Sequence, residues 1–172
     1  MLILSVEEVA MSEAIYDIIV DYNLSLAKMI AAGKYDVIPH DIKEVSIPIQ
    51  ESGIQAVTIE FVRFWYTDDR RVMMHYLQYR EDMTTEEVLK DMESKQMRPA
   101  TLPELLAFGA KFRKVQQYFS IVALGTIIGC NRGTRRAPVL GGYSWEKGAR
   151  LFGLELADFR WGRTGLFAAV RK

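Results

Sequence analysis

The order of helix and strand signals along the chain predicts an α+β fold with an antiparallel sheet. Two capping boxes in the middle of the chain each predict the start of a helix. Short apolar runs, rich in β-branched residues and separated by glycine-rich turns, follow these helices and predict strands. With 172 residues, 49% of them hydrophobic, the chain is long enough to bury one sizeable core.

The pattern of apolar and acidic residues over 1–53 predicts an acidic helical extension before the sheet. Apolar residues recur near helical spacing over residues 6–21, with acidic residues opposite them, so this segment is predicted to be an amphipathic helix. Ser25 is expected to cap a short second helix that Gly33 stops. The proline-punctuated residues 34–53 are predicted to be loop and extended chain.

Residues 54–172 predict a sheet domain, which either stands apart from the extension or joins it in one compact unit. Runs from Ile54 to Tyr66 and from Val72 to Tyr79 are β-branched and aromatic, and they predict a hairpin covered on both faces. Four later strand-like runs follow, at residues 121–125, 137–142, 150–156 and 165–171.

The two capping boxes lie between the hairpin and these later strands. A Thr-x-x-Glu box over residues 84–87 begins a helix predicted to reach about Gln96. A second box over residues 101–104 begins another helix, with Pro103 in its first turn and Gly109 as its expected stop.

The net charge of zero hides two halves of opposite charge. Residues 1–97 contain 9 Lys/Arg and 18 Asp/Glu, whereas residues 98–172 contain 13 and 4. A basic C-terminal half either engages an anionic partner or docks on the acidic half of the same molecule. Both interpretations stay open at this point.

The composition argues against several classes of function. Cys130 is the single cysteine, which excludes an intramolecular disulfide and a multi-cysteine zinc site and suits a reducing compartment. No apolar run approaches the length that spans a membrane, and the first residues lack the basic flank of a signal peptide. We therefore expect a cytoplasmic protein with no cofactor, no bound metal and no membrane contact, and the oligomeric state is open.

Several motifs together carry a resemblance to known proteins. They are Leu26 to Asp36 in a Leu-x-x-x-Ile-x-x-Gly-x-Tyr-Asp pattern, Arg98-Pro-Ala-Thr-Leu-Pro-Glu-Leu-Leu-Ala-Phe, the Val-Ala-Leu-Gly run at 122–125 and the closing Phe167-Ala-Ala-Val-Arg-Lys. The chain resembles a group of uncharacterised bacterial proteins over most of residues 25–172. More distantly, it is similar to the C-type-lectin-like fold of formylglycine-generating-enzyme-like domains and of retroelement variable proteins.

The resemblance implies a scaffold and not a chemistry. Formylglycine-generating enzymes hold copper with a cysteine pair, and this chain has one cysteine. Calcium-dependent sugar binding uses a Glu-Pro-Asn-like loop and a Trp-Asn-Asp-like strand, and the sequence has neither. The C-type-lectin-like fold presents its late loops as a binding face, which would be residues 130–136, 142–149 and 157–165 here.

These late loops carry the candidate partner-binding residues, which combine guanidinium groups with aromatic rings. They are Arg132, Arg135, Arg136, Tyr143, Trp145, Arg160, Trp161 and Arg163. Arginine binds carboxylate or phosphate groups and tryptophan stacks on a base, so an anionic protein or a nucleic acid would suit this face. The alternative is that the arginines are solvated and the tryptophans belong to the core.

No set of residues in the sequence specifies a reaction. The carboxylate pairs Asp68/Asp69, Glu81/Asp82 and Glu86/Glu87 suit turns and the first turns of helices. His40, Asp41 and Glu44 would raise the case for an enzyme or a metal site if they met His75.

We therefore expect a non-enzymatic protein that binds a protein or another anionic macromolecule through its basic late loops. One alternative is a nucleic-acid-binding or defence-modulating protein of a mobile element, and another is an enzyme with an unrecognised carboxylate site.

Overall fold

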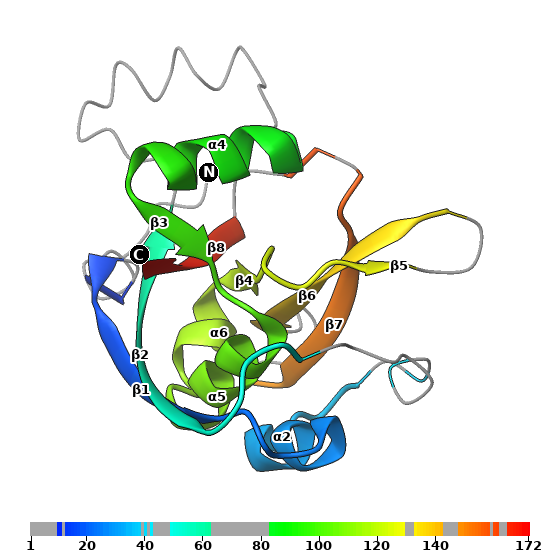
Figure 1. The fold of residues 1–172 in the computed structure, drawn as a ribbon. Helices are drawn as coiled ribbons and strands as arrows, with labels where there is room; N and C mark the ends of the chain where they lie inside the picture. The colour runs from blue at the N-terminus through cyan, green and yellow to red at the C-terminus, as the bar shows by residue number, and fades with distance from the viewer. Residues whose placement is uncertain are drawn as a thin grey trace.

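The computed structural model describes residues 10–11, 13–38, 40, 42, 49–62, 83–129, 133–142, 148–158, 160–161 and 165–172. Its architecture is α+β, with one large mixed sheet and a few helices (Figure 1). The second strand of the predicted hairpin, at residues 72–79, lies outside the described residues.

Within the described residues the sheet contains eight strands, and its main path runs β1-β2-β8-β4-β6-β5. Strand β3 pairs with β8 and β7 pairs with β6, beside this path. The strands are β1 (Tyr16–Asp21), β2 (Ile54–Val62), β3 (Met97–Pro99), β4 (Ser120–Val122), β5 (Ile128–Gly129), β6 (Arg135–Gly142), β7 (Arg150–Leu156) and β8 (Gly165–Arg171). These pairs are antiparallel except β4 with β8, which is parallel, so the sheet is mixed and not purely antiparallel.

Four helices belong to the described fold. They are α2 (Leu26–Gly33), α4 (Thr85–Ser94), α5 (Leu102–Lys111) and the short α6 (Val115–Tyr118). Both predicted boxes begin helices, since Glu87 Oε2 accepts from Thr84 N (2.8 Å) and Glu104 Oε2 accepts from Thr101 N (2.7 Å). Ser25 occupies the position before α2, but its side chain makes no capping hydrogen bond.

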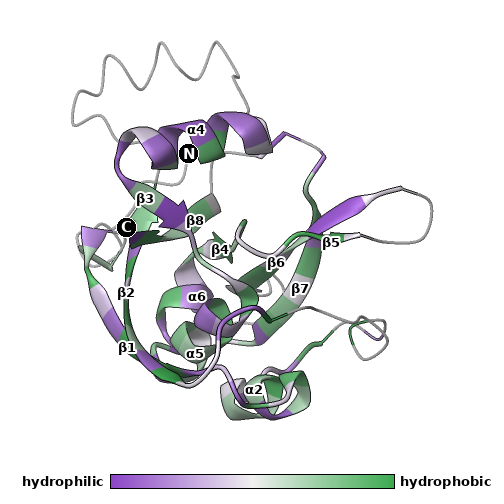
Figure 2. Ribbon diagram, viewed as in Figure 1, coloured by the Kyte–Doolittle hydropathy of each residue, from purple (hydrophilic) through white to green (hydrophobic). Residues whose placement is uncertain are grey.

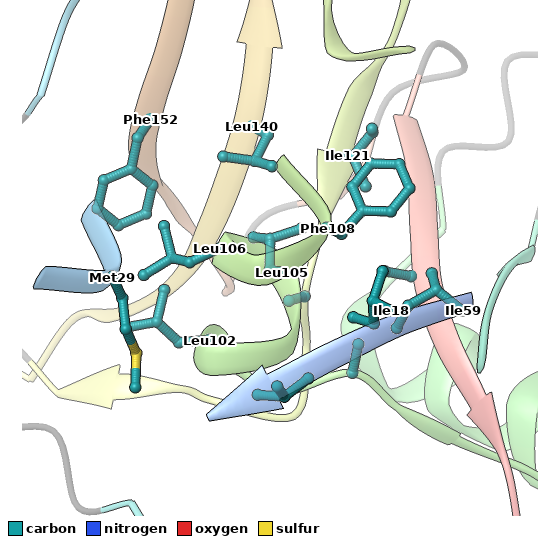
Figure 3. Close-up of a cluster of buried hydrophobic side chains, with 14 of the residues drawn as sticks. Ile18, Met29, Ile59, Leu102, Leu105, Leu106, Phe108, Ile121, Leu140 and Phe152 are labelled. Carbon is teal, nitrogen blue, oxygen red and sulfur yellow. The ribbon is translucent and has the colours of Figure 1, made fainter. Parts of the chain in front are cut away.

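The larger hydrophobic core lies between α5 and the sheet. Leu105, Leu106 and Phe108 of α5 are fully buried, and they point toward strand residues such as Ile18 and Leu140 (Figure 3). Helix α2 adds Met29 to the same core. Burying aliphatic side chains of this size stabilises the fold by about 1.5–3 kcal/mol each.

A smaller core lies beneath α4. Val88 and Met92 of α4 pack with Val62, Val122 and Phe167 of the sheet. The remaining surface of α4 is mostly hydrophilic, as Figure 2 shows. Side chains are thus buried on both faces of the sheet in two separate clusters, but the outer face of β2 is covered only at its Val62 end and Ile54 stays exposed, so the prediction that this strand is covered on both faces was wrong there.

Two of the predicted element boundaries were wrong. The helix predicted over residues 6–21 is helical at residues 10, 11 and 13 but is replaced by strand β1 from Tyr16, because alternate side chains from Tyr16 to Val20 are buried in the larger core beneath α5. Gly109 does not stop α5, which continues to Lys111. Gly109 serves close packing instead, since a Cβ there would lie 2.4 Å from Tyr35 Oη.

The two oppositely charged halves of the chain are joined by ion pairs. Among the described residues, Lys172 Nζ lies 2.6 Å from Glu93 Oε1, and Arg135 Nη2 lies 3.4 Å from Glu86 Oε1. Arg171 pairs with Glu60 between β8 and β2. Docking of the halves within the molecule thus accounts for part of the charge asymmetry.

Candidate partner-binding surface

Parts of the predicted late loops gather at the N-terminal end of α4 (Figure 1). Trp161 N donates to Met83 O (2.7 Å), just before α4, and Thr85 Oγ1 donates to Ala157 O (2.6 Å) at the end of β7. We call the exposed side chains here, Glu86, Glu87, Arg135, Asp158 and Arg160, the α4-end surface.

Arg135 is the centre of the α4-end surface. Its Nε donates to Asp158 Oδ1 (2.6 Å), its backbone N donates to Asp158 Oδ2 (2.9 Å), and its Nη2 donates to Glu86 Oε1 (3.4 Å). The backbone N–H and the guanidinium of Arg135 hold the pKa of Asp158 below its ordinary value. One arginine is thereby fixed between two carboxylates from separate elements.

Glu87 adds a further carboxylate to this surface. Hydrogen bonding from the Thr84 backbone N–H is the main reason that the pKa of Glu87 is lowered, and the charge of Arg160 contributes in the same direction. Arg136 is half-buried and lies opposite Leu156 and Ile128 in the sheet register. Arg135 and Arg160 thus lie near carboxylates on this surface.

Trp161 belongs to the smaller core. Its Nε1 donates to Thr85 Oγ1 (2.8 Å), and its ring meets Phe167 edge-to-face at 5.6 Å between centroids. These contacts hold the start of α4 against β8. Trp161 therefore has a structural role, and a contribution to partner binding remains a prediction.

The other candidate residues are not placed by the structure. Arg132, Tyr143, Trp145 and Arg163 lie outside the described residues, as does Cys130. His40 is described and exposed, whereas Asp41, Glu44 and His75 fall outside, and so do the carboxylate pairs at 68–69 and 81–82.

Sequence reasoning missed the acidic members of the α4-end surface. The sequence predicts Glu86 only as a carboxylate in the first turn of a helix, and it gives Asp158 no predicted role. A signal for Asp158 is present, since it lies in the turn two residues after β7, and an Asp side chain in a turn commonly accepts from nearby N–H groups. Its pairing with Arg135 spans 23 residues and depends on the register of β6 and β7.

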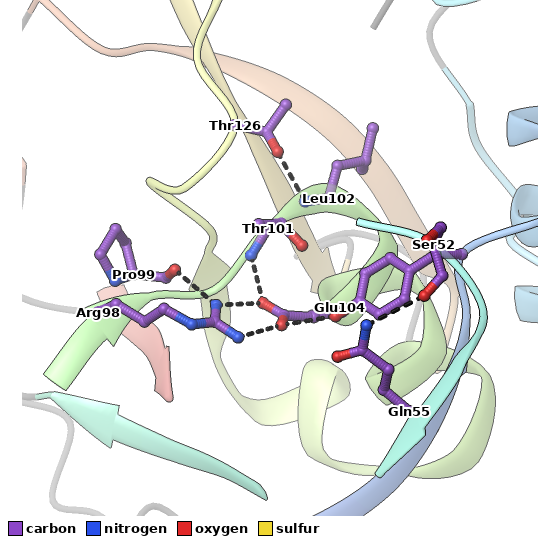
Figure 4. Close-up of polar contacts among 9 residues, drawn as sticks. Ser52, Gln55, Arg98, Pro99, Thr101, Leu102, Glu104 and Thr126 are labelled. Carbon is purple, nitrogen blue, oxygen red and sulfur yellow. Dashed lines mark hydrogen bonds and ion pairs between the residues drawn. The ribbon is translucent and has the colours of Figure 1, made fainter. Parts of the chain in front are cut away.

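A second polar cluster lies at the start of α5 (Figure 4). Glu104 is fully buried, and its Oε1 accepts from Arg98 Nη2 (2.6 Å) and Tyr22 Oη (2.8 Å). Its Oε2 accepts from Arg98 Nη1 (3.0 Å) and Thr101 N (2.7 Å). With four bonds the carboxylate has little capacity for a substrate, so we assign this cluster to stability.

Burial and hydrogen bonding shift the pKa of Glu104 in opposite directions. Burial favours the neutral acid, but the bonds from Arg98 and Thr101 outweigh it, and the pKa of Glu104 lies below its ordinary value. Burial and the bond to Glu104 raise the pKa of Tyr22. The cluster is therefore a carboxylate with a guanidinium and a neutral phenol.

A buried arginine joins the C-terminal ends of two helices. Arg150 Nη2 donates to Gly109 O of α5 (2.6 Å) and to Gln116 Oε1 (2.9 Å), and its Nη1 donates to Gly33 O of α2. The Tyr35 ring lies 5.0 Å from the guanidinium. A cation at two helix C-termini is favoured by both helix dipoles, which gives Arg150 a structural role.

The described residues contain no group of three or more His, Cys, Asp and Glu side chains arranged to hold a metal ion. In the same part of the chain, none of the helices has the length and apolar character needed to cross a membrane.

Comparison of the chain with protein-family models, with curated proteins and with solved structures finds no match. The candidate surface therefore has to be interpreted from its own geometry.

Proposed function

We propose that this protein is a non-enzymatic binding protein that recognises a partner protein through the α4-end surface. The observation that carries the proposal is the arrangement of Arg135 between Asp158 and Glu86 on an exposed face. Surface charges of both signs in a fixed geometry favour a partner with complementary charges.

A protein partner suits this surface better than a nucleic acid does. A polyanion gains affinity when free cations replace its counterions. Arg135 is already held by two carboxylates, so binding a phosphate would require breaking contacts of 2.6 Å and 3.4 Å or bringing Asp158 near the phosphate. A partner that offers both a carboxylate and a cation would meet Arg135 and Asp158 together.

The scaffold is part of the same proposal. We propose that the later strands β4 to β8 and their loops are used in the manner of a C-type-lectin-like domain, with the loops near α4 as the recognition face. The support is the motif resemblance together with the gathering at one end of α4 of Ala157 and Trp161, which bond Thr85, and of Asp158, which reaches Glu86 through Arg135. A cytoplasmic location is proposed from the single cysteine.

Affinity capture with three baits tests the proposal. The baits are the wild-type protein, an Arg135→Ala/Arg160→Ala variant, and an Arg171→Ala/Lys172→Ala control that removes the same charge from the β8 end of the molecule. We expect a captured protein to be lost with the first variant and kept with the control. Direct binding of that purified protein should then be weakened at least about tenfold by the first variant only.

Labelled single- and double-stranded nucleic acids, titrated over a salt series, provide the opposing measurement. Binding that weakens steeply with salt and is lost in the Arg135→Ala/Arg160→Ala variant would replace the proposal with the nucleic-acid alternative. Capture of the same proteins by both variants would contradict a role for the α4-end surface.

A further inference from the structure

The outer face of strands β1 and β2 exposes large aliphatic side chains. Ile15, Ile19 and Ile54 are 61%, 62% and 68% exposed, whereas the alternate side chains of β1 are buried beneath them. We call this surface the β1–β2 outer face, and it consists of Ile15, Asp17, Ile19, Asp21, Ile54, Ala56 and Thr58. Several exposed large apolar side chains on one face of a sheet can mark an interaction site.

This face continues into the smaller core. In the β1–β2 register Ile19 lies opposite Ala56 and Asp17 opposite Thr58, so these residues share one side of the sheet. Val62, four residues beyond Thr58 and thus on the same side, is buried with Val88 and Met92 of α4. Helix α4 covers one end of this side, and in the described part of the chain the β1 end stays exposed.

The edge of β1 is partly closed to an added strand. Tyr22 N donates to Gly53 O across the register, so the backbone groups of Asp17, Ile19 and Asp21 point away from β2. Lys111 Nζ donates to Asp17 O (2.7 Å), and Leu24 N donates to Asp21 O (3.3 Å), so two of these carbonyl groups already have donors. Lysines at sheet edges oppose strand addition, so an occupant would lie across the face.

Charge decides between a second copy of the chain and a different partner. Asp17 and Asp21 alternate with Ile15 and Ile19, and Thr58 Oγ1 donates to Asp17 Oδ1 (2.7 Å), which fixes that carboxylate on the outer face. Packing two copies of this face together would bring like charges close to one another. A cationic partner would gain from the same carboxylates.

We propose that the β1–β2 outer face docks a cationic amphipathic helix of a partner protein, which extends the helical layer that α4 begins. Aliphatic side chains of that helix contact Ile15, Ile19 and Ile54, and flanking lysines or arginines contact Asp17 and Asp21. This site is distinct from the α4-end surface, because β1 lies at the opposite end of the sheet order from β5 and β6.

Three synthetic helical peptides test the proposal, with affinity measured by fluorescence anisotropy at physiological salt. The first carries an aliphatic stripe flanked by lysines, the second has glutamates in place of the lysines, and the third keeps the lysines but has serines in the stripe. We expect the first peptide to bind at least about tenfold more tightly than the other two.

Matched variants locate the binding. Ile15→Ser/Ile19→Ser should weaken the first peptide at least about tenfold. Tyr118→Ser, which removes another exposed large side chain on α6, should leave its affinity unchanged. Far-UV circular dichroism and the melting temperature of both variants should match the wild type, because both sites are exposed.

Three results would overturn the proposal. They are equal binding of all three peptides, unchanged affinity in the Ile15→Ser/Ile19→Ser variant, and a wild-type dimer in sedimentation velocity that this variant dissociates. The first two would show that the face is not the binding site, and the third would assign it to a second copy of the chain.

Discussion

Helices α4 and α5 both begin with Thr-x-x-Glu, but the two glutamates have different surroundings. Glu87 of α4 is exposed, and its hydrogen bonds return to Thr84 within the same box. Glu104 of α5 is fully buried and also binds Arg98 and Tyr22, which come from other parts of the chain. The same local motif is therefore a helix cap in one case and an anchor between distant segments in the other.

The difference follows from where each helix packs. Helix α5 lies within the larger core, with its first-turn residue Leu102 and the neighbouring Leu105 buried. Helix α4 places only its inner side chains on the smaller core, so Glu86 and Glu87 of its first turn stay at the surface while Thr85 beside them is buried. A buried carboxylate needs several partners to offset its desolvation, whereas an exposed one keeps its water.

Replacing Glu104 or Glu87 by glutamine should give the largest difference in the free energy of unfolding between the two capping boxes. Glu104→Gln leaves the half-buried Arg98 cation without its counter-charge, and we expect a loss of about 2–4 kcal/mol in the free energy of unfolding. The Arg98 side chain is 37% exposed, so water partly solvates its charge and reduces this loss. Glu87→Gln should cost clearly less in the same urea titration, and an equal loss would show that burial does not distinguish the two boxes.

The pH dependence of stability should locate the effect in the ionised form of Glu104. Its pKa is lower in the folded protein than its ordinary value of 4.5, so the stabilisation is present above pH 4.5 and is lost as pH falls below it. The difference in unfolding free energy between wild type and Glu104→Gln should therefore shrink between pH 6 and about pH 3. A constant difference over this range would contradict a role for the charge.

Gly109→Ala tests the close packing of α5, which has no counterpart in α4. An added methyl would lie 2.4 Å from Tyr35 Oη and 2.6 Å from Leu140 Cδ1. Overpacking of this kind costs about 1–3 kcal/mol, whereas replacing glycine by alanine in a helix gains about 1 kcal/mol. We therefore expect Gly109→Ala to lower the melting temperature. Gly129→Ala is the control, because a Cβ there meets no atom within 4 Å.

Thr84→Ala tests the exposed box and should cost less than Glu104→Gln. Loss of the Thr84 hydroxyl leaves Glu87 N without its acceptor at 3.2 Å, which should cost about 1 kcal/mol in urea unfolding. Ser25→Ala should cost less, since the Ser25 side chain makes no capping bond to α2. The reverse order of the two losses would contradict the assigned cap geometry.

Part of the fold could be predicted because its signals are local. The boxes at 84–87 and 101–104 identified the starts of α4 and α5, and Gly33 marked the end of α2. The runs that became β2, β6, β7 and β8 were found from their β-branched and apolar residues. The sequence could not separate helix from strand over residues 16–21, since an apolar pattern of this length fits both periods.

The candidate surface was less predictable than the fold. Sequence analysis identified Arg135 and Arg160 as exposed cations, but it could not find Asp158 and Glu86 as the carboxylates that hold Arg135. It also left Trp161 open between a partner surface and the core, and the structure packs its ring on Phe167. These pairings depend on strand register and on the position of α4, which no local pattern encodes.

The sequence by itself determined the α+β class, the helix starts at the two boxes, most strand positions and the opposite charges of the two halves. Only the tertiary structure decided that Glu104 is buried beneath Arg98 and Tyr22, that Arg150 joins two helix ends, and that the β1–β2 outer face stays exposed. The physical reason is the difference in sequence separation between the interactions. Caps and side-chain periodicity act over a few residues, whereas burial and ion pairing are set by segments that lie far apart in the chain.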